Sequence, residues 1–271
     1  MRRINSNIIT EEVKRLCIEG NTILGDDVIK SFEENLTKEE SHLGRDILKI
    51  LIKNTYIAKE KSIPICQDTG MAVFFVEVGQ DVIVVGDTLT EAINKGVSQG
   101  YIQGYLRKSV VSPIERINTK DNTPAIIHYE MVKGDKIKIK YAPKGFGSEN
   151  MSKLKMLKPS DGIDGIKQFI IDTVSEAGPN PCPPIVVGVG IGGTVDKCAQ
   201  IAKKALFRNI GEHNKDENIK NLEREMLEKI NNLGIGPQGF GGNTTALAVN
   251  IETFPTHNIN CHCARHKQVI I

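Results

Sequence analysis

The chain has 271 residues, a hydrophobic content of 39% and a formal net charge of +2. Its charged content of 25% and mean hydropathy of −0.22 exclude a disordered chain, a collagen and a coiled coil. The 35 basic residues are interleaved with 33 acidic ones, so we expect no nucleic-acid partner. Because no apolar run approaches the ~20 residues that cross a bilayer and no signal peptide is evident, we expect no membrane association and a cytoplasmic location.

The apolar periodicity predicts alternating helices and strands along the chain. In chain order the predicted elements are a helix from Thr10, a helix from Ser41 through Leu51, strands at 72–78 and 82–85, a helix from Thr88 or Thr90 to about Leu106, a β-hairpin at 125–141 around a turn at 133–135, a loop at 145–150, a helix at 164–177, a strand at 185–189, helices at 194–208 and 217–233, and a strand at 245–251. We interpret this order as a mixed α/β fold, a single compact unit with N-terminal helices, mixed sheets and surrounding helices, forming one domain over residues 1–271.

The cysteines fall into two groups. Cys17 and Cys198 lie on predicted helices, where a thiol usually behaves as a small buried hydrophobic group. Cys66, Cys182 and Cys261 lie in predicted loops, and the loop of Cys182 is stiffened by prolines. Three thiolates from distant loops can hold an iron–sulfur cluster by three corners and leave one iron open to substrate, although unrelated loop thiols would give the same pattern.

Two other patterns carry weaker signals. The glycine-rich stretch 188–193 lies between a predicted strand and a predicted helix, like a dinucleotide fingerprint, but no second strand with an acidic end follows at the required distance. The helix start could receive a carboxylate, and a tight strand-to-helix turn is the simpler interpretation. In the tail, four potential ligands lie within ten residues and could hold zinc, with a spacing unlike that of zinc fingers. They are His257, Cys261, Cys263 and His266.

The string Ile-Pro-Ile-Cys-Gln-Asp-Thr-Gly at 63–70 closely resembles the cluster loop of the class I, iron–sulfur-dependent fumarases and the related tartrate dehydratases. Further stretches resemble motifs of that family in the same order and cover nearly the whole chain. They are Tyr105–Ser109, Lys144–Asn150, Asn180–Pro184, Gly236–Thr244, Pro255–His257 and Asn258–His262. The resemblance implies the alpha subunit of a hydro-lyase whose active site is completed by a separate beta subunit, in a dimer of alpha–beta pairs.

The resemblance also implies the cofactor. Cys66, Cys182 and Cys261 would ligate a [4Fe–4S] cluster whose fourth iron has no protein thiolate. That iron would act as a Lewis acid toward the hydroxyl of the substrate rather than as an electron carrier.

The resemblance further implies roles at the substrate. Gln67, Asp68 and His257 would be the catalytic residues, with Asp68 as the candidate acid or base. Arg107 would bind a carboxylate of a small dicarboxylic acid through two parallel hydrogen bonds. Gly145 would let main-chain amides approach the other end of the diacid, and Gly147 would do the same. The simpler interpretations are an Asx-type turn for Asp68 and a surface helix position for Arg107.

The tail departs from the family pattern. Family members carry about eight apolar residues between the histidine of Pro-Thr-His and the Asn-Ile-x-Cys string, whereas here His257 continues directly into Asn258. Eight extended residues span roughly 26–29 Å, so His257 and Cys261 would need a different chain path. Cys263 is therefore an alternative third ligand.

We expect a hydro-lyase that interconverts malate and fumarate, with tartrate and oxaloacetate as the second choice of substrate and product. The alternative that arises from the shortened tail is a non-catalytic paralogue that keeps the fold and the partner interface but does not assemble the cluster.

Overall fold

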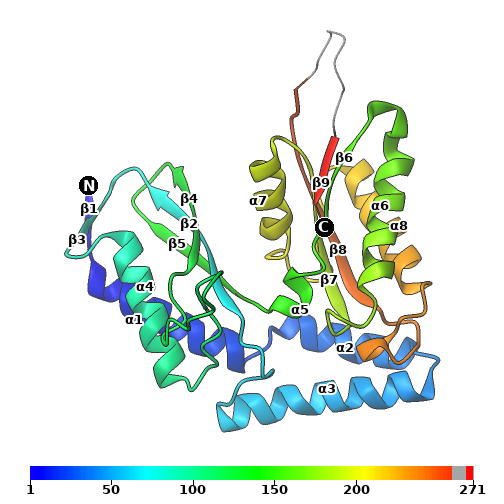
Figure 1. Cartoon of the computed structure of the whole chain (residues 1–271), viewed down its shortest axis with the longest axis horizontal. Helices are drawn as coiled ribbons and strands as arrows, with labels where there is room; N and C mark the ends of the chain where they lie inside the picture. Colours follow the sequence, from blue (N-terminus) through cyan, green and yellow to red (C-terminus); the bar gives the residue numbers. More distant parts are fainter. Residues whose placement is uncertain (258–266, 271) are drawn as a thin grey trace. The chain divides into compact units, whose positions relative to one another are not determined.

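The computed structural model describes residues 1–257 and 267–270 (Figure 1). It confirms the mixed α/β class. The residues group into two compact units, a division that the pattern of helices and strands did not indicate. The first unit contains Met1–Leu24 and Lys53–Phe146, and the second contains Gly25–Ile52 and the described residues from Gly147 onward. No helix within the described part of the chain combines the length and apolar character needed to cross a membrane.

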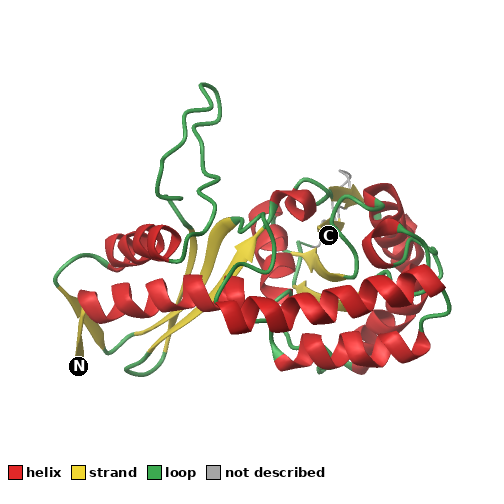
Figure 2. Cartoon of the chain, turned by 90° about the horizontal axis from the view of Figure 1, so that it is seen from below, coloured by secondary structure: helices red, strands yellow, loops and turns green. Residues whose placement is uncertain are grey.

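The first unit contains two sheets and the helices that pack on them. Its elements are β1 (Arg2–Asn5), α1 (Ser6–Thr22), the end of α3 (His42–Lys61), β2 (Met71–Gly79), β3 (Val82–Val85), α4 (Leu89–Gln103), β4 (Ile126–Val132) and β5 (Ile137–Lys144). Strands β1 and β3 form a parallel pair, and β4, β2 and β5 form a three-stranded sheet. Figure 2 shows the long irregular connection between α4 and β4 as a green loop.

The second unit is built around one four-stranded sheet in the order β6-β9-β7-β8. Its elements are α2 (Asp26–Lys38), the start of α3, α5 (Phe146–Glu149, whose first residue belongs to the first unit), β6 (Leu154–Leu157), a 3-10 turn (Pro159–Asp161), α6 (Gly162–Ala177), β7 (Ile185–Gly192), α7 (Val195–Ala205), α8 (Glu217–Asn231), a second 3-10 turn (Pro237–Gly239), β8 (Ala246–Phe254) and β9 (Lys267–Ile270).

Capping residues set the starts of α3 and α4 where the sequence predicts them. Thr88 caps α4 in a reciprocal capping box with Glu91, and the hydroxyl of Ser41 accepts the amide of Gly44 at the start of α3. The first helix is an exception, because it begins at Ser6 with Asn5 as its cap and not at Thr10. Thr10 is buried inside α1, and its hydroxyl donates to the carbonyl of Ala92 on α4.

The predicted hairpin at 125–141 is wrong in its pairing. Strands β4 and β5 form at the expected positions, but β2 lies between them, parallel to β4 and antiparallel to β5. The turn crosses the end of β2, where the amide of Gly79 donates to the carbonyl of Lys136. A side chain at position 79 would not fit, because its Cβ would lie 2.4 Å from the carbonyl oxygen of Gly134. The apolar residues of β2 gain more burial in a central position, which alternation within 125–141 alone could not reveal.

Helices α1 and α4 pack together against the three-stranded sheet (Figure 1). Buried residues at helical spacing on α1 meet alternate residues of β2, which is the packing expected of an amphipathic helix on a sheet. This core contains Ile9, Val13 and Cys17 from α1, Ala72, Phe74 and Val76 from β2, and Ala92, Ile93, Val97 and Tyr101 from α4. The prediction that Cys17 is a core residue is confirmed, and burial raises the pKa of its thiol to about 12.

Helices cover both faces of the sheet in the second unit, with α6 and α8 on one face and α7 on the other (Figure 1). Val187 and Val189 of β7 point toward α6 and α8. On the opposite face, a Cβ on Gly188 would lie 2.4 Å from the carbonyl oxygen of Ala202, and one on Gly190 would be 2.2 Å from that of Cys198. The glycines of the apparent dinucleotide fingerprint therefore bring α7 close to β7, which supports the packing interpretation.

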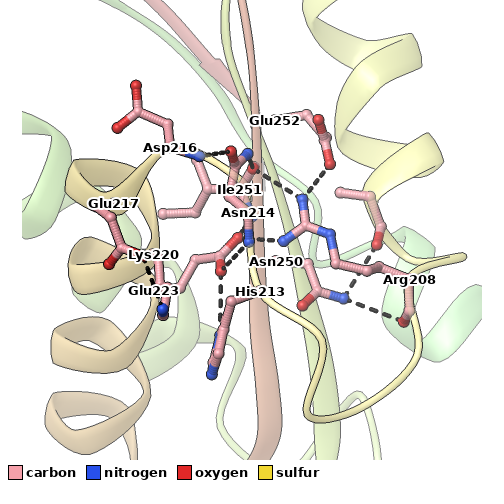
Figure 3. Close-up of polar contacts among 11 residues, drawn as sticks. Arg208, His213, Asn214, Asp216, Glu217, Lys220, Glu223, Asn250, Ile251 and Glu252 are labelled. Carbon is pink, nitrogen blue, oxygen red and sulfur yellow. Dashed lines mark hydrogen bonds and ion pairs between the residues drawn. The ribbon is translucent and has the colours of Figure 1, made fainter.

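A buried carboxylate joins α8 to β8 and to the loop after α7 (Figure 3). Glu223 is 1% exposed and accepts the amides of Ile251 at 2.8 Å and Asn214 at 3.0 Å. It also pairs with Arg208, whose guanidinium in turn contacts Glu252. Burial lowers the pKa of Arg208, but these carboxylates outweigh it and raise the pKa above the ordinary value. Removing Glu223 would leave a partly buried cation without its main partner.

We expect Glu223→Ala to lower the free energy of unfolding by about 3–5 kcal/mol, because breaking a buried ion pair leaves the remaining charge uncompensated. Urea unfolding followed by circular dichroism measures the change. Glu225→Ala on the same helix is the control, since its ion pairs with Lys167 and Lys229 are more exposed and should contribute less than about 1 kcal/mol. Equal losses from the two variants would show that the buried network is not a main source of stability.

Candidate active site

The cysteine loop of the first unit connects α3 to β2 and is held at both ends. The amide of Ile65 donates to the carbonyl of Asn21, and its carbonyl accepts the side-chain amide of Asn54. At the other end, Gly70 has a positive φ of 65°, and a Cβ there would lie 2.4 Å from the main chain of Lys144. Between these points Cys66 and Gln67 are exposed. The loop thus presents both predicted site residues on a fixed main chain.

Asp68 forms the turn that its simpler interpretation predicts, and it also makes a long-range contact. One carboxylate oxygen accepts the amide of Gly70 at 3.0 Å in an Asx-type turn. The other accepts the amide of Phe146 at 2.9 Å. A Cβ on Gly145 would lie 3.1 Å from this second oxygen, so a larger residue would crowd the carboxylate. The structure therefore brings Asp68 and Gly145 together.

Arg107 lies in the connection after α4, so the alternative that it is a surface helix residue is wrong. Its amide donates to the hydroxyl of Thr69 at 3.0 Å, and that hydroxyl donates to the carbonyl of Arg107 at 3.2 Å. The side chain of Arg107 is exposed. The main chain of Arg107 is thus attached directly to the residue that follows Asp68.

The thiol of Cys66 has surroundings that suit a thiolate ligand. Its Sγ accepts the amide of Asp68 at 3.4 Å and lies 3.6 Å from Oε1 of Gln67. Main-chain N–H donors to sulfur stabilise thiolate ligands and tune the iron–sulfur clusters that they bind. The main-chain N–H of Asp68 that donates to Sγ is therefore the feature of this loop that fits an iron–sulfur ligand.

Cys182 is exposed in a second rigid loop, which belongs to the second unit. Its φ is 56°, a left-handed value that non-glycine residues seldom adopt. The side-chain amide of Gln238 donates to the carbonyls of Cys182 at 3.2 Å and Pro183 at 2.9 Å. Gly147 packs against the same loop, since a Cβ there would lie 2.9 Å from the carbonyl oxygen of Asn180. Gly147 and Gly145 therefore have different neighbours.

A buried glutamate that the sequence analysis did not single out holds the glycine-rich loop of the second unit. Glu39 is 2% exposed and accepts the amides of Asn243 at 2.9 Å, Thr244 at 2.8 Å and Ser41 at 3.0 Å. Burial disfavours the charged form, but these donors outweigh it and lower the pKa of Glu39. The same glycine-rich loop carries Gln238, so Glu39 helps to fix the segment that holds the Cys182 loop.

Comparison with known proteins identifies the family. Residues 10–270 match the family model described as fumarate hydratase (Fumerase). The chain belongs to this family. The fumarate hydratase family catalyses hydro-lyase chemistry, and the family resemblance seen in the sequence is confirmed.

Several similar proteins carry the name of a related activity. An archaeal protein of Methanocaldococcus jannaschii is 47% identical over 255 residues, 92% of this chain and 90% of its own length, and its name assigns it provisionally as an L(+)-tartrate dehydratase subunit alpha. Proteins named L(+)-tartrate dehydratase subunit alpha from Escherichia coli strain K12 and Shigella sonnei are each 32% identical, over 93% of this chain and 84% of their own lengths. The names of all three proteins refer to the dehydration of tartrate.

The tail ligands lie almost entirely beyond the described part of this family member. His257 is exposed, three residues after the end of β8. Cys261, Cys263 and His266 fall outside the described residues, so the third cluster ligand and the zinc alternative stay predictions. Among residues 1–257 and 267–270, no group of three His, Cys, Asp or Glu side chains gathers to bind a metal.

We expect Glu39→Gln to destabilise the protein above about pH 4.3, the ordinary glutamate pKa, by about 1–3 kcal/mol. Because the folded-state pKa of Glu39 is lowered, its stabilising effect is present above the unfolded pKa and is lost as pH falls through the folded one. Urea unfolding between pH 7 and pH 3 should therefore show a wild-type advantage that shrinks on acidification. An advantage that does not change over this range would contradict the assignment.

Proposed function

We propose that the chain is the alpha subunit of a [4Fe–4S]-dependent hydro-lyase that interconverts a 2-hydroxy dicarboxylate and its dehydrated product. Family membership supports the reaction class, and the names of the relatives support L(+)-tartrate as substrate at least as well as the malate–fumarate pair. The same names support a separate beta subunit as partner, which we place in a dimer of alpha–beta pairs. The observation that carries the proposal is the attachment of Arg107 to the loop of Asp68.

Dehydration breaks the C–O bond to the hydroxyl group and removes a proton from the neighbouring carbon, so that one water is released. Malate gives fumarate in this way, and tartrate gives an enol that tautomerises to oxaloacetate. Loss of the proton next to a carboxylate places negative charge on that carboxylate in the transition state. The site therefore needs a positioned base and a positive group that binds the developing charge.

The residues of the first unit supply these functions in the proposal. Arg107 binds a substrate carboxylate through its planar guanidinium. Asp68 takes or returns the proton, because its carboxylate is held in one orientation by two main-chain N–H groups and is only half-buried. Gln67 and His257 are assigned as further catalytic residues, and both are exposed.

We assign substrate binding to Gly145 and Gly147 as well. At each position a side chain would crowd a neighbouring group of the site loops: the carboxylate of Asp68 for Gly145, and the carbonyl oxygen of Asn180 for Gly147. Glycine at these positions would let the far end of the diacid approach the main chain closely.

We assign the cluster to Cys66, Cys182 and Cys261, with Cys263 as the alternative third ligand. Cys66 and Cys182 are free and exposed thiols in rigid loops, and Cys66 accepts a main-chain N–H at sulfur. When bound, the cluster would supply a Lewis-acidic iron that polarises the C–O bond of the substrate. Free thiols at the described cysteines suit the reducing cytoplasm, which stays our predicted location.

We expect Cys66→Ser and Cys182→Ser each to remove most of the iron and sulfide from anaerobically reconstituted alpha–beta complex, because each removes one of three thiolate ligands. Iron and sulfide assays and the visible absorbance of the cluster measure the loss. Cys198→Ala is the matched control and should keep full iron content, since Cys198 is buried in α7. Serine variants of Cys261 and Cys263 then decide which of the two is the third ligand.

The wild-type complex should dehydrate L(+)-tartrate or malate under the same anaerobic conditions. A wild-type complex that binds no iron after competent reconstitution would contradict the proposal and support the non-catalytic paralogue. Zinc that depends on Cys263 and His266, with Cys66 and Cys182 dispensable, would support the zinc site instead.

We expect Arg107→Lys to raise KM for the dicarboxylate by about 10–100-fold, because an ammonium group cannot form the two parallel hydrogen bonds of a guanidinium. Steady-state kinetics of the loaded complex measure the effect, and iron content should be unchanged. Lys108→Arg is the control, because the neighbouring residue belongs to the same loop and has no assigned role. An unchanged KM would show that Arg107 does not bind the substrate.

A further inference from the structure

Thr69 connects two loops of the first unit through a single hydroxyl group. The hydroxyl accepts the amide of Arg107 at 3.0 Å and donates to the carbonyl of the same residue at 3.2 Å. Thr69 is 2% exposed, so water does not compete strongly for these bonds. Both main-chain polar groups of Arg107 are therefore bound to one side chain, 38 residues earlier in the chain.

Asn122 makes a second connection between the same two loops. It is fully buried, and its side-chain amide donates to the carbonyl of Gly70 at 3.0 Å. Its side-chain oxygen accepts the amides of Ser109 at 2.7 Å and Val110 at 3.2 Å. The φ of Asn122 is 64°, a left-handed value that asparagine tolerates better than most residues. One side chain thus holds the residues that follow Asp68 and the residues that follow Arg107.

Tyr101 supports this arrangement from α4. Its hydroxyl lies 2.8 Å from the carbonyl oxygen of Thr69, 3.2 Å from that of Gly70 and 3.1 Å from the hydroxyl of Tyr141. Burial raises the pKa of Tyr101 to about 12. A tyrosine hydroxyl is protonated at neutral pH even without this shift, so it can donate to these carbonyls. The main chain of Thr69 and Gly70 is therefore held by the helix as well as by Asn122.

We infer that Thr69 and Asn122 are positioning residues for the proposed reaction, which hold the main chains of Arg107 and Asp68 at a fixed separation. The inference rests on the proposed function of those two side chains. Neither Thr69 nor Asn122 carries a charge, and both are buried, so they act through the groups that they hold.

Fixing the separation of the two main chains matters because the side chains of Asp68 and Arg107 are restrained to different degrees. The carboxylate of Asp68 accepts two main-chain amides, whereas the side chain of Arg107 is exposed. The hydroxyl of Thr69 restrains the main chain of Arg107, from which this exposed side chain extends. A misplacement of about 1 Å at a reacting geometry can cost about 10²-fold in rate.

We expect Thr69→Val, which keeps the shape of threonine but lacks the hydroxyl, to lower kcat/KM by about 10²-fold in the loaded alpha–beta complex. Iron content should stay at the wild-type level, because the amide donor to Cys66 belongs to Asp68. Thr69→Ser keeps the hydroxyl and should restore most of kcat/KM. Asn122→Asp, which keeps the acceptor but loses the donor to Gly70, is a second variant and should also lower kcat/KM.

A double-mutant cycle with Arg107→Ala separates positioning from a general structural role. If Thr69 acts through Arg107, Thr69→Val should have little further effect once the guanidinium is absent. Equal effects of Thr69→Val in the presence and absence of Arg107 would overturn the inference, as would equal kcat/KM for Thr69→Val and Thr69→Ser. The two failures are distinguishable. A wild-type complex without any hydro-lyase activity would overturn the proposed function and this inference with it. An active wild-type complex whose variants give the equal values described above would overturn this inference alone.

Discussion

The candidate site depends on hydrogen bonds from side chains to irregular main chain. The loop from Cys66 to Gly70 has neither helical nor sheet hydrogen bonds to determine its path. Its buried polar groups must nevertheless find partners, since an unpaired main-chain group in a protein interior is costly. Asn122 and Tyr101 supply partners to the main chain of this loop, and the hydroxyl of Thr69 in turn binds the main chain of Arg107 in the neighbouring connection.

In the second unit, a buried charged group binds the main chain of an irregular loop. Three amides surround the carboxylate of Glu39 and determine the course of the glycine-rich loop, which places Gln238 against the main chain of Cys182. An ionised acceptor forms stronger hydrogen bonds than a neutral one, which suits a loop with many glycines and therefore a large entropy cost of ordering. Each exposed cysteine loop is thus held by a different set of hydrogen bonds within its own unit.

Many helix and strand positions could be predicted because they follow from local signals, whereas α2 and β6 were not predicted. The capping threonine of α4, the serine before α3 and the glycine after α6 all act within a few residues of themselves. Strand pairing could not be predicted in the same way. Alternation between Ala125 and Tyr141 indicated two strands, but the choice between a hairpin and insertion of β2 depends on burial of distant residues.

The sequence by itself determined the family, the α/β class and the residue types of the candidate site, because these are carried by short motifs and by local periodicity. Only the tertiary structure decided which groups hold them. Thr69 and Arg107 lie 38 residues apart, Gly70 and Asn122 lie 52 apart, and Glu39 and Thr244 lie 205 apart. The residues next to Thr69, Asn122 and Glu39 in the sequence do not indicate which distant groups these side chains bind, because the contacts form only when the chain has packed.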